Sequence, residues 1–533
     1  MNTTARQARS EHGFSMFLVI MALFLTSMFV AAGFAAANGD LPLTGLNKDR
    51  KTAYAAAEAG LNYYATQVHE DPDYWTHCEN VPAPSATEPN PVNPVWNGVG
   101  ADPRRWRNVT GAVSQYTIEV LPANGKPQCV DGDQTTMLDQ KSGTFRVRVT
   151  GRPSATSRLH RSIIATFKRN GFLDYLYFTN YEDLDPQALT TQTARDTADK
   201  YCAGLYRWER PKAGAPSGTS CTEIQWITGD GVAGPMHSND SLLVCNSPTF
   251  GRDSNDKIEV VAKVGGRVAA SGCTDQTNMV GAWKPGAQPL YPPTNNQPLK
   301  AIATNGGKLF TGETVIYLNG ANMTVTSGGS TSTMPLPTNG VIFVQNGTTG
   351  TCTTQYPVSV DYSVDDSACG NVYVSGTYSQ SLTIAADNDV IIAPTSGGTV
   401  DWTSTNESLV HTNDAVLGLI ANRFVRVGHA VSNCANVAPN FKNLNLTVDA
   451  AILALSHSWI VDNYGCGQAG KLTVFGAISQ QYRGPVGTGN HATGFLKDYN
   501  YDDRLRYRSP PYFLSPVAAQ WSVVRSNEQV PAR

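Results

Sequence analysis

An uncharged apolar run near the amino terminus, residues 13–37, constrains this chain more than any other feature. As an α-helix it would be about 37 Å long, at 1.5 Å per residue, and the hydrocarbon layer of a bilayer is about 30 Å thick. No second run of this kind follows. We therefore expect one membrane-spanning helix, with a buried helix of a soluble protein as the alternative. The side chains expected to contact lipid or neighbouring helices are Phe17, Leu18, Val19, Ile20, Leu23, Phe24, Leu25, Phe29 and Val30.

A cleaved secretory signal is a second interpretation of the same run. Arg6 and Arg9 would supply its positive leader, and the alanines at 35–37 resemble a cleavage site. The apolar core is longer than the roughly 7–15 residues that a signal needs, which favours retention of the helix. Positive charges stand on both sides of the run, so charge bias does not fix its orientation.

All ten cysteines lie after the apolar run, and none forms a Cys-x-x-Cys pair. This spacing gives little support to a zinc or thioredoxin-like site. An even number in a weakly charged chain favours disulfides in an oxidising compartment over buried thiols in the cytosol. Neighbours could pair, for example Cys202 with Cys221, Cys245 with Cys273 and Cys352 with Cys369, but sequence does not fix the connectivity. The disulfide candidates are Cys78, Cys129, Cys202, Cys221, Cys245, Cys273, Cys352, Cys369, Cys434 and Cys466.

The composition excludes several classes of partner. The 533 residues include 40 Lys and Arg and 43 Asp and Glu, a net charge of −3, so we expect no nucleic-acid partner. Charged residues make up 16%, and the abundance of Thr, Ser, Asn and Gly suits turn-rich β structure. The sequence contains no Walker loop, dinucleotide fingerprint, Gly-x-Ser-x-Gly or His-Glu-x-x-His, and we expect no cofactor.

A helix-favouring segment, residues 46–61, follows the apolar run and is rich in alanine. Tyr54, Ala57, Leu61, Tyr64 and Val68 recur at helical spacing and predict one apolar stripe. Between the run and this segment, the proline and glycine at positions 42 and 45 should end or kink the first helix.

This arrangement resembles the amino-terminal region of type IV pilins, most closely the minor pilins of the PilX kind. The likeness rests on a polar leader ending in Gly13, on Phe14 after it, on the apolar run, and on a helical motif. The resemblance implies that a prepilin peptidase cuts between Gly13 and Phe14 and that the new amino terminus is methylated. It also implies that the helix anchors the subunit in membrane lipid before it packs with other pilin subunits, recruited by the pilus assembly machinery. The motif residues are Asp49, Arg50, Ala53, Ala56, Ala57, Glu58, Ala59, Gly60 and Leu61.

One residue departs from the pilin pattern. Most major pilins carry a glutamate at the fifth position after the cut, where this chain has Leu18. In the family that glutamate is thought to pair with the amino terminus of a neighbouring subunit. The departure favours a minor or accessory role over that of a bulk fibre subunit.

Three β-strands are predicted after the helix, at residues 116–120, 145–149 and 162–167, with a turn at 151–154. The aromatic segment 171–181 is interpreted as a packed connector, with a binding strip as the alternative. From about residue 227 onward short β-like runs alternate with turns, several of them Asn-Gly, and no helical stripe is evident. Very short strands that are apolar on both faces favour a β-solenoid over a sandwich or a barrel.

The expected fold class is α+β: a long amino-terminal transmembrane or pilin-type helix with a small antiparallel sheet, then a large all-β domain, a β-solenoid (β-helix). The expected regions are a leader at 1–13, the helix at 14–70, a pilin-like β region at 71–170, a connector at 171–226, the solenoid at 227–490 and a cap at 491–533. The tail could instead form a subunit-contact surface. We expect a single-pass location in the cell membrane, with a cytoplasmic amino terminus and an exported remainder that reaches the cell surface or a pilus.

Candidate catalytic or metal-binding groups are sparse. Asp361, Asp365 and Asp366 form the best acidic cluster, in what looks like a solvated loop without EF-hand spacing. His237 and His457 are isolated, as structural histidines usually are. We therefore expect no metal site and no catalytic residue, and a structural, pilin-like subunit. The alternatives are a membrane-anchored adhesin that binds a surface glycan or a host cell surface, and a secreted β-helix enzyme acting on polysaccharides.

Overall fold

The computed structural model describes residues 14–71, 73–76, 106–123, 125–127, 129–130, 132–139, 143–169, 171–396, 398–402, 408–433, 436–437, 445–489, 492–517, 519 and 521–532. The chain divides into two compact units. The first comprises Met1–Met137, Phe145–Phe167 and Val523–Arg533, and the second comprises Leu138–Thr144 and Lys168–Ser522.

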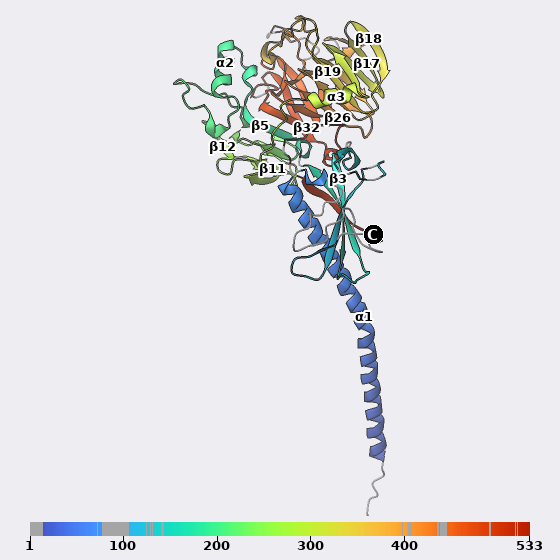
Figure 1. Ribbon diagram of the computed structural model, residues 1–533. Coiled ribbons are helices and arrows are strands. Elements are labelled where there is room, and N and C mark those ends of the chain that lie inside the picture. Colours follow the sequence, from blue (N-terminus) through green and yellow to red (C-terminus); the bar gives the residue numbers. More distant parts are fainter. Residues whose placement is uncertain are drawn as a thin grey trace, which may run out of the picture. The chain divides into compact units, whose positions relative to one another are not determined.

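In the first unit a long helix packs against a five-stranded sheet with the order β1-β2-β3-β4-β34 (Figure 1). The pairs β1–β2 and β2–β3 are antiparallel, with Ile118 opposite Val149. The three strands expected from alternating apolar residues are confirmed. The elements are α1 (Phe14–Glu70), η1 (Tyr74–Thr76), β1 (Arg107–Asn108), β2 (Gln115–Leu121), η2 (Gln134–Thr136), β3 (Thr144–Arg152), β4 (Arg161–Arg169) and β34 (Trp521–Gln529).

Aromatic rings fill the core of the first unit. Phe145 of β3 stacks between Trp75 and Phe167, with ring centroids 5.3 and 5.0 Å apart, and Tyr64 of α1 meets Phe167 edge-on at 5.4 Å. All four side chains are fully buried. Aromatic side chains remove large apolar areas from water, so this cluster fixes the second half of α1 on the sheet.

Strand β34 comes from the carboxyl end of the chain, where sequence analysis had expected a cap. It lies beside β4 at the edge of the sheet. Arg148 of β3 donates from Nε to Oε1 of Gln529 at 2.8 Å, and Arg161 of β4 forms an ion pair with Glu528. The two ends of the described chain therefore belong to the same unit.

Helix α1 continues through Pro42 as one element. The expectation that the first helix ends there is wrong. A proline costs a helix one backbone hydrogen bond, but its fixed φ of about −65° lies within the helical range. Long helical flanks on both sides can therefore sustain the element.

The predicted membrane span is also wrong. Among the described side chains, no helix is long and apolar enough to cross a membrane. The predicted single-pass location with a cytoplasmic amino terminus is therefore not supported either.

The second unit is almost entirely β structure wound in parallel register (Figure 1). Ile384 of β21 pairs with Ile342 of β19 on one side and with Leu419 of β26 on the other, and the column continues to Ile452 of β30 and Ile478 of β32. All five side chains are fully buried. Each strand is bonded on both sides, so it can stay short and apolar on both faces.

Most strands of the second unit have two to nine residues, and β32 has sixteen. They are β5 (Tyr177–Leu184), β6 (Trp226–Ile227), β7 (Gly231–Val232), β8 (Met236–Ser238), β9 (Leu242–Cys245), β10 (Thr249–Phe250), β11 (Lys257–Val260), β12 (Arg267–Ala269), β13 (Asn278–Met279), β14 (Ala282–Pro285), β15 (Lys308–Thr311), β16 (Thr314–Gly320), β17 (Asn322–Ser327), β18 (Ser330–Pro335), β19 (Val341–Gln345), β20 (Val372–Tyr378), β21 (Leu382–Ala386), β22 (Val390–Ile392), β23 (Thr395–Ser396), β24 (Thr399–Val400), β25 (Leu409–His411), β26 (Leu417–Ala421), β27 (Val425–Val427), β28 (Val431–Asn433), β29 (Asn436–Val437), β30 (Leu446–Ala454), β31 (Trp459–Val461), β32 (Gln468–Arg483) and β33 (Gly494–Tyr501). The helical elements are η3 (Phe172–Asp174), η4 (Pro186–Ala188), α2 (Gln192–Tyr201), η5 (Arg207–Glu209), α3 (Gln297–Thr304), η6 (Pro357–Ser359) and η8 (Asp503–Arg506).

The strand order of the main sheet closes on itself, which corrects the predicted β-solenoid. β32 pairs through Ile478 with Tyr177 of β5, and β5 pairs through the same Tyr177 with Met236 of β8. β33 adds to β32, with Val474 opposite Tyr499. Strands before and after the expected solenoid thus lie among its windings, and closure removes exposed sheet edges. The fold class predicted from the sequence is therefore wrong both in its membrane helix and in its β-solenoid.

Helix α3 was also missed, because the sequence showed no helical stripe in this half. It is a short helix with a proline in its first turn, a position that proline suits. Leu299 and Ala303 are its buried residues, and they join a small core with Val341 and Phe343 of β19. Two buried positions are too few to establish a period.

Candidate functional site

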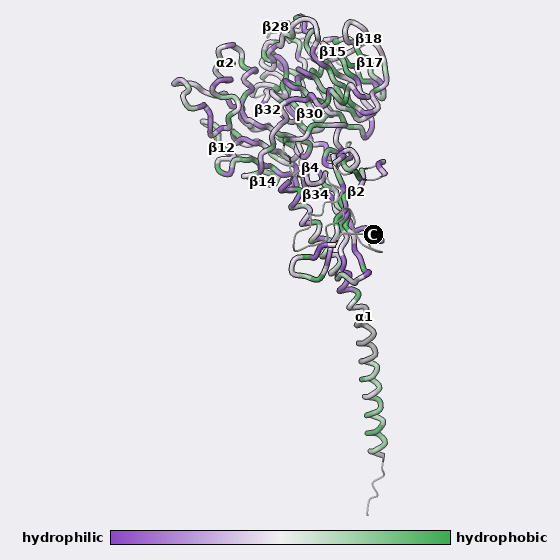
Figure 2. Tube along the Cα trace, in the orientation of Figure 1, coloured by the Kyte–Doolittle hydropathy of each residue, from purple (hydrophilic) through white to green (hydrophobic). Residues whose placement is uncertain are grey.

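The exposed apolar segment of α1 is the most unusual surface of the described chain. All described side chains from 16 to 32 are exposed, and Figure 2 shows the strongly apolar start of the helix. Phe24 is 68% exposed and Phe29 76% exposed. The predicted assembly residues in this segment, Phe17, Leu18, Val19, Ile20, Leu23, Phe24, Leu25, Phe29 and Val30, are all exposed large hydrophobics.

This segment is apolar around the whole helix. A surface helix normally keeps its apolar side chains to one stripe, and a helix that is apolar all round is normally buried. Burying one large aliphatic or aromatic side chain contributes about 1.5–3 kcal/mol. Exposed hydrophobic patches of this size mark interaction surfaces.

The family motif lies in the second half of α1 and packs on the sheet. Ala53, Ala56 and Ala57 are fully buried, and Gly60 is buried against Tyr116 of β2. The charged motif residues Asp49, Arg50 and Glu58 are exposed, while Ala59 and Leu61 are half-buried. The small residues therefore form the face that meets the strands.

Gly151 is a contact of this helix that sequence analysis misread as part of a turn. It lies in β3, and a Cβ atom there would overlap the backbone oxygen of Ala53 and lie 3.0 Å from the Cβ of Ala56. Only glycine allows a backbone approach this close. The neighbouring Pro153 is typical of a turn, and for that reason the contact of Gly151 with the helix was not predicted.

The predicted processing pair is described only in part. Gly13 lies outside the described residues, and Phe14 is the first residue of α1. Cleavage between them stays a prediction.

Three of the suggested disulfides are confirmed: Cys202–Cys221, Cys245–Cys273 and Cys352–Cys369. Cys129 and Cys466 are also disulfide-bonded, so every cysteine within the described ranges is oxidised. Cys78 and Cys434 lie outside those ranges. Pairing of sequence neighbours suits a wound β structure, in which each loop returns to the same side.

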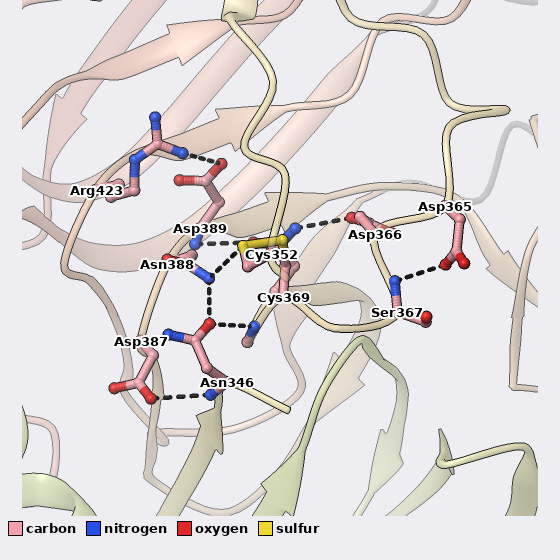
Figure 3. Close-up of a disulfide and its surroundings, with 12 residues drawn as sticks. Asn346, Cys352, Asp365, Asp366, Ser367, Cys369, Asp387, Asn388, Asp389 and Arg423 are labelled. Carbon is pink, nitrogen blue, oxygen red and sulfur yellow. Dashed lines mark hydrogen bonds and ion pairs between the residues drawn. A yellow bond between two sulfur atoms is a disulfide. The ribbon is translucent and has the colours of Figure 1, made fainter. Parts of the chain in front are cut away.

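The bond between Cys352 and Cys369 closes a loop onto a hydrogen-bonded stack of turns (Figure 3). Asn346 accepts from the backbone nitrogen of Gly370 at 2.8 Å and from Nδ2 of Asn388 at 2.5 Å, and its own nitrogen donates to Asp387 at 2.9 Å. Asparagine side chains thus join successive windings where the strands turn. The arrangement holds the loop in place and has a structural role.

The predicted acidic cluster does not converge on one point. Asp361 accepts from Ser363, and Asp365 accepts from the backbone of Ser367 at 2.9 Å (Figure 3). Asp366 is buried and accepts from Nδ2 of Asn371 at 2.7 Å. Within the described chain no group of three or more His, Cys, Asp or Glu is placed to hold a metal ion.

Asp366 has a carboxyl partner that the sequence did not reveal. A hydrogen bond with Asp366, burial, and the charges of Asp366 and Asp365 raise the pKa of Glu313 to about 8. Glu313 and Asp366 lie on different windings, and the backbone nitrogen of Glu313 donates to Ser367 at 3.1 Å. Glu313 therefore keeps its proton to a higher pH than an ordinary glutamate does.

The two isolated histidines sit in structural networks. Nδ1 of His237 lies 3.3 Å from Glu259 and Nε2 lies 3.0 Å from Oδ1 of Asn239, all three residues being buried. His457 lies 3.2 Å from the buried Asp185, which also accepts from Ser458 at 2.8 Å.

A buried ionic network is a further feature that sequence reasoning missed. Arg426 lies between two carboxylates, with Nε 3.1 Å from Asp389 and Nη1 2.9 Å from Asp462. Tyr362 donates to Asp462 at 2.6 Å, and burial with this charge raises the Tyr362 pKa well above its ordinary value. Arg426, Asp389 and Asp462 are buried, and Tyr362 is half-buried. A single arginine within a three-residue strand gives no local signal of such a network.

Comparison with known proteins yields one weak structural neighbour. No family profile matches the chain, and no curated protein does. The crystal structure of the competence-associated pilin ComZ from Thermus thermophilus is similar to this chain at 11% identity and a TM-score of 0.23. The comparison covers 90% of this chain and 97% of that chain. A similarity of this strength agrees with a pilin-like chain at most, and we rest no argument on it.

Proposed function

We propose that this chain is a pilin-like, minor or accessory subunit of a filament of the type IV pilus kind. The observation that supports the proposal is the exposed apolar segment of α1 at residues 16–32. The second half of the same helix is already packed on the sheet of the first unit. One half of the helix is thus fixed to its own subunit, and the other half is left for neighbouring subunits.

The mechanism is assembly. Helices that are apolar on every side bury one another when several subunits bring them together, and the removal of apolar surface from water drives the association. Leu18, which is 58% exposed, contributes to this apolar surface. It occupies the position at which most major pilins carry a glutamate, and this supports an accessory role. No catalytic step is part of the proposal.

Site-specific photo-crosslinking tests the proposal. A photoreactive phenylalanine at Phe24, in cells that produce the full chain, should yield crosslinked species larger than the 57.2 kDa subunit. The matched control carries the same group at Trp208, an exposed aromatic residue of the second unit, and should yield far less product. Equal crosslinking from both positions, or none from Phe24, would contradict the proposal.

The variant Phe24→Asp provides a second measurement. A charge in the middle of the apolar segment should reduce assembly into filament fractions, because an unpaired charge is costly in an apolar contact. The first unit should keep its stability, since Phe24 has no part in its core. Mass spectrometry of filament-associated protein would show in the same sample whether the amino terminus is Phe14.

A further inference from the structure

A pocket of 380 Å³ opens in the second unit around the turn that follows β33. Its polar walls include Arg252, Asp503 and Arg504, and its aromatic walls include Phe475 and Tyr507. The volume lies in the range of about 300–1,000 Å³ that is usual for small-ligand sites. None of these residues belongs to the assembly segment of α1.

The charges of this pocket cancel within its walls. Arg252 donates to both carboxylate oxygens of Asp503, at 2.8 and 3.1 Å, and Arg504 donates to both oxygens of Asp502, at 2.9 and 2.7 Å. A pocket whose charged side chains are already paired with one another offers little attraction to a phosphate, a sulfate or a cation. It still presents fixed donors and acceptors, because a carboxylate has about four lone-pair positions and a guanidinium has five N–H donors.

The aromatic walls add apolar ring faces beside these polar groups. Tyr507 is 65% exposed, and Phe475 projects half-buried from β32. An exposed tyrosine ring offers a flat apolar face that a ligand can cover, beside a hydroxyl group that can hydrogen-bond. Neutral sugars present the matching surface, with C–H groups on the ring face and hydroxyl groups around its edge.

The second unit has another, more open pocket of 460 Å³. Arg508 lines it, and Tyr507 of the first pocket is the preceding residue, so their Cα atoms are about 3.8 Å apart. The other walls are Ser379, Ser381, Asn413, Asp414 and Ala415, which are small or hydrogen-bonding. Arg508 donates from Nη1 to the backbone oxygen of Asp414 at 2.8 Å.

We propose that the two pockets, joined at Tyr507 and Arg508, form a groove that binds a neutral oligosaccharide or polysaccharide. A sugar ring covers Tyr507 in the first pocket, and the next sugars of the chain continue past Arg508 into the second. The balanced ion pairs select uncharged sugars over uronic acids and sulfated glycans. This binding is independent of the assembly role of α1.

The test uses the full chain and a defined panel of glycans. Neutral hexasaccharides of glucose, galactose, mannose and N-acetylglucosamine are compared with dextran sulfate and polygalacturonate, and affinities are measured by calorimetry. We expect binding to at least one neutral member and weaker binding to the anionic polymers. Absence of binding to every neutral member, or preference for an anionic polymer or an unrelated peptide, would overturn the proposal.

Variants assign the binding to the groove. Tyr507→Ala should weaken binding about tenfold, and Tyr507→Phe should restore it, because the ring face makes the contact. Tyr291→Ala, which removes another exposed tyrosine of this unit, is the matched control and should bind as the parent chain does. Arg508→Ala should weaken the hexasaccharide more than the disaccharide of the same sugar. Equal affinities of Tyr507→Ala and Tyr291→Ala, with unchanged thermal unfolding, would overturn the assignment.

Discussion

Gly151 of β3 and Ala53 of α1 lie in backbone contact: a Cβ atom on Gly151 would overlap the backbone oxygen of Ala53 and lie 2.5 Å from the backbone nitrogen of Ala57. Gly60, further along the helix, lies against side chains instead, and a Cβ atom there would come within 2.7 Å of Tyr116 and Val149. The helix is therefore seated on the sheet through small residues, at a separation that larger ones would prevent. The alanine-rich motif follows from this packing, independently of any processing or assembly step.

The first prediction concerns this contact. Gly151→Val should destabilise the first unit by about 1–3 kcal/mol or more, because backbone atoms cannot move aside as a flexible side chain can. Hydrogen exchange of the backbone amides at residues 50–68 in the full chain measures the effect locally. Gly45→Ala is the control, since a Cβ at Gly45 meets nothing within 4 Å. It should leave exchange unchanged or slower, because alanine favours the helix. Equal protection in Gly151→Val and the parent chain would contradict the interpretation.

Local patterns identified the helix and three of the strands of the first unit. Alternating residues such as Phe145, Val147 and Val149 identified the strands, and helical spacing identified Tyr64 and Val68 as buried. Gly151 was misread because glycine close to proline usually signals a turn, and only the tertiary contact shows its purpose. Strand β34 was missed because its partner β4 lies several hundred residues earlier in the chain.

In the second unit the strands could be predicted from the sequence, but their pairing order could not. The short strands were recognisable, yet their closed order was not, because pairs such as Ile478 and Tyr177 leave no periodic trace. Neighbouring cysteines such as Cys352 and Cys369 were paired correctly, since a winding brings residues one loop apart together. The pocket that Tyr507 lines combines residues that lie far apart in the sequence, so no sequence motif predicts it.

The second prediction concerns the buried Arg426. Arg426→Met should cost about 3–5 kcal/mol, because it leaves Asp462 without its cation and Asp389 with only the longer 3.7 Å pair to Arg423. Urea unfolding followed by fluorescence measures the loss. Lys263→Met removes an exposed positive charge from the same unit and should change the stability by less than about 0.5 kcal/mol. Similar losses of unfolding free energy in the two variants would contradict a stabilising role for the buried ionic network.

The third prediction concerns the bond between Cys352 and Cys369. Replacing both with alanine should lower the free energy of unfolding by about 2–4 kcal/mol, the usual cost of opening a loop of this length, here a sequence separation of 17. Proteolysis should then cut between residues 347 and 368 before the rest of the second unit. If the cut sites do not change, the hydrogen bonds of Asn346 alone suffice to hold the loop.

The last prediction is a pH dependence that arises from Glu313. Its hydrogen bond with Asp366, its burial and the neighbouring carboxylates raise its pKa from the ordinary 4.5 to about 8. The folded chain therefore binds a proton that the unfolded chain releases between about pH 4.5 and 8, so stability contributed by this proton is complete below pH 4.5 and is lost as the pH rises toward 8.

Glu313→Gln keeps a hydrogen-bond donor beside Asp366 and removes the titration. The variant should match the parent chain near pH 5, exceed it in thermal stability at pH 8.5, and show a flatter stability profile between the two. Asp414→Asn, at a side chain that is 83% exposed, is the control and should retain the slope of the parent chain. A slope that persists in Glu313→Gln would place the titrating group elsewhere. A slope absent from the parent chain would mean that the Glu313 carboxyl group is ionised at neutral pH despite its partner.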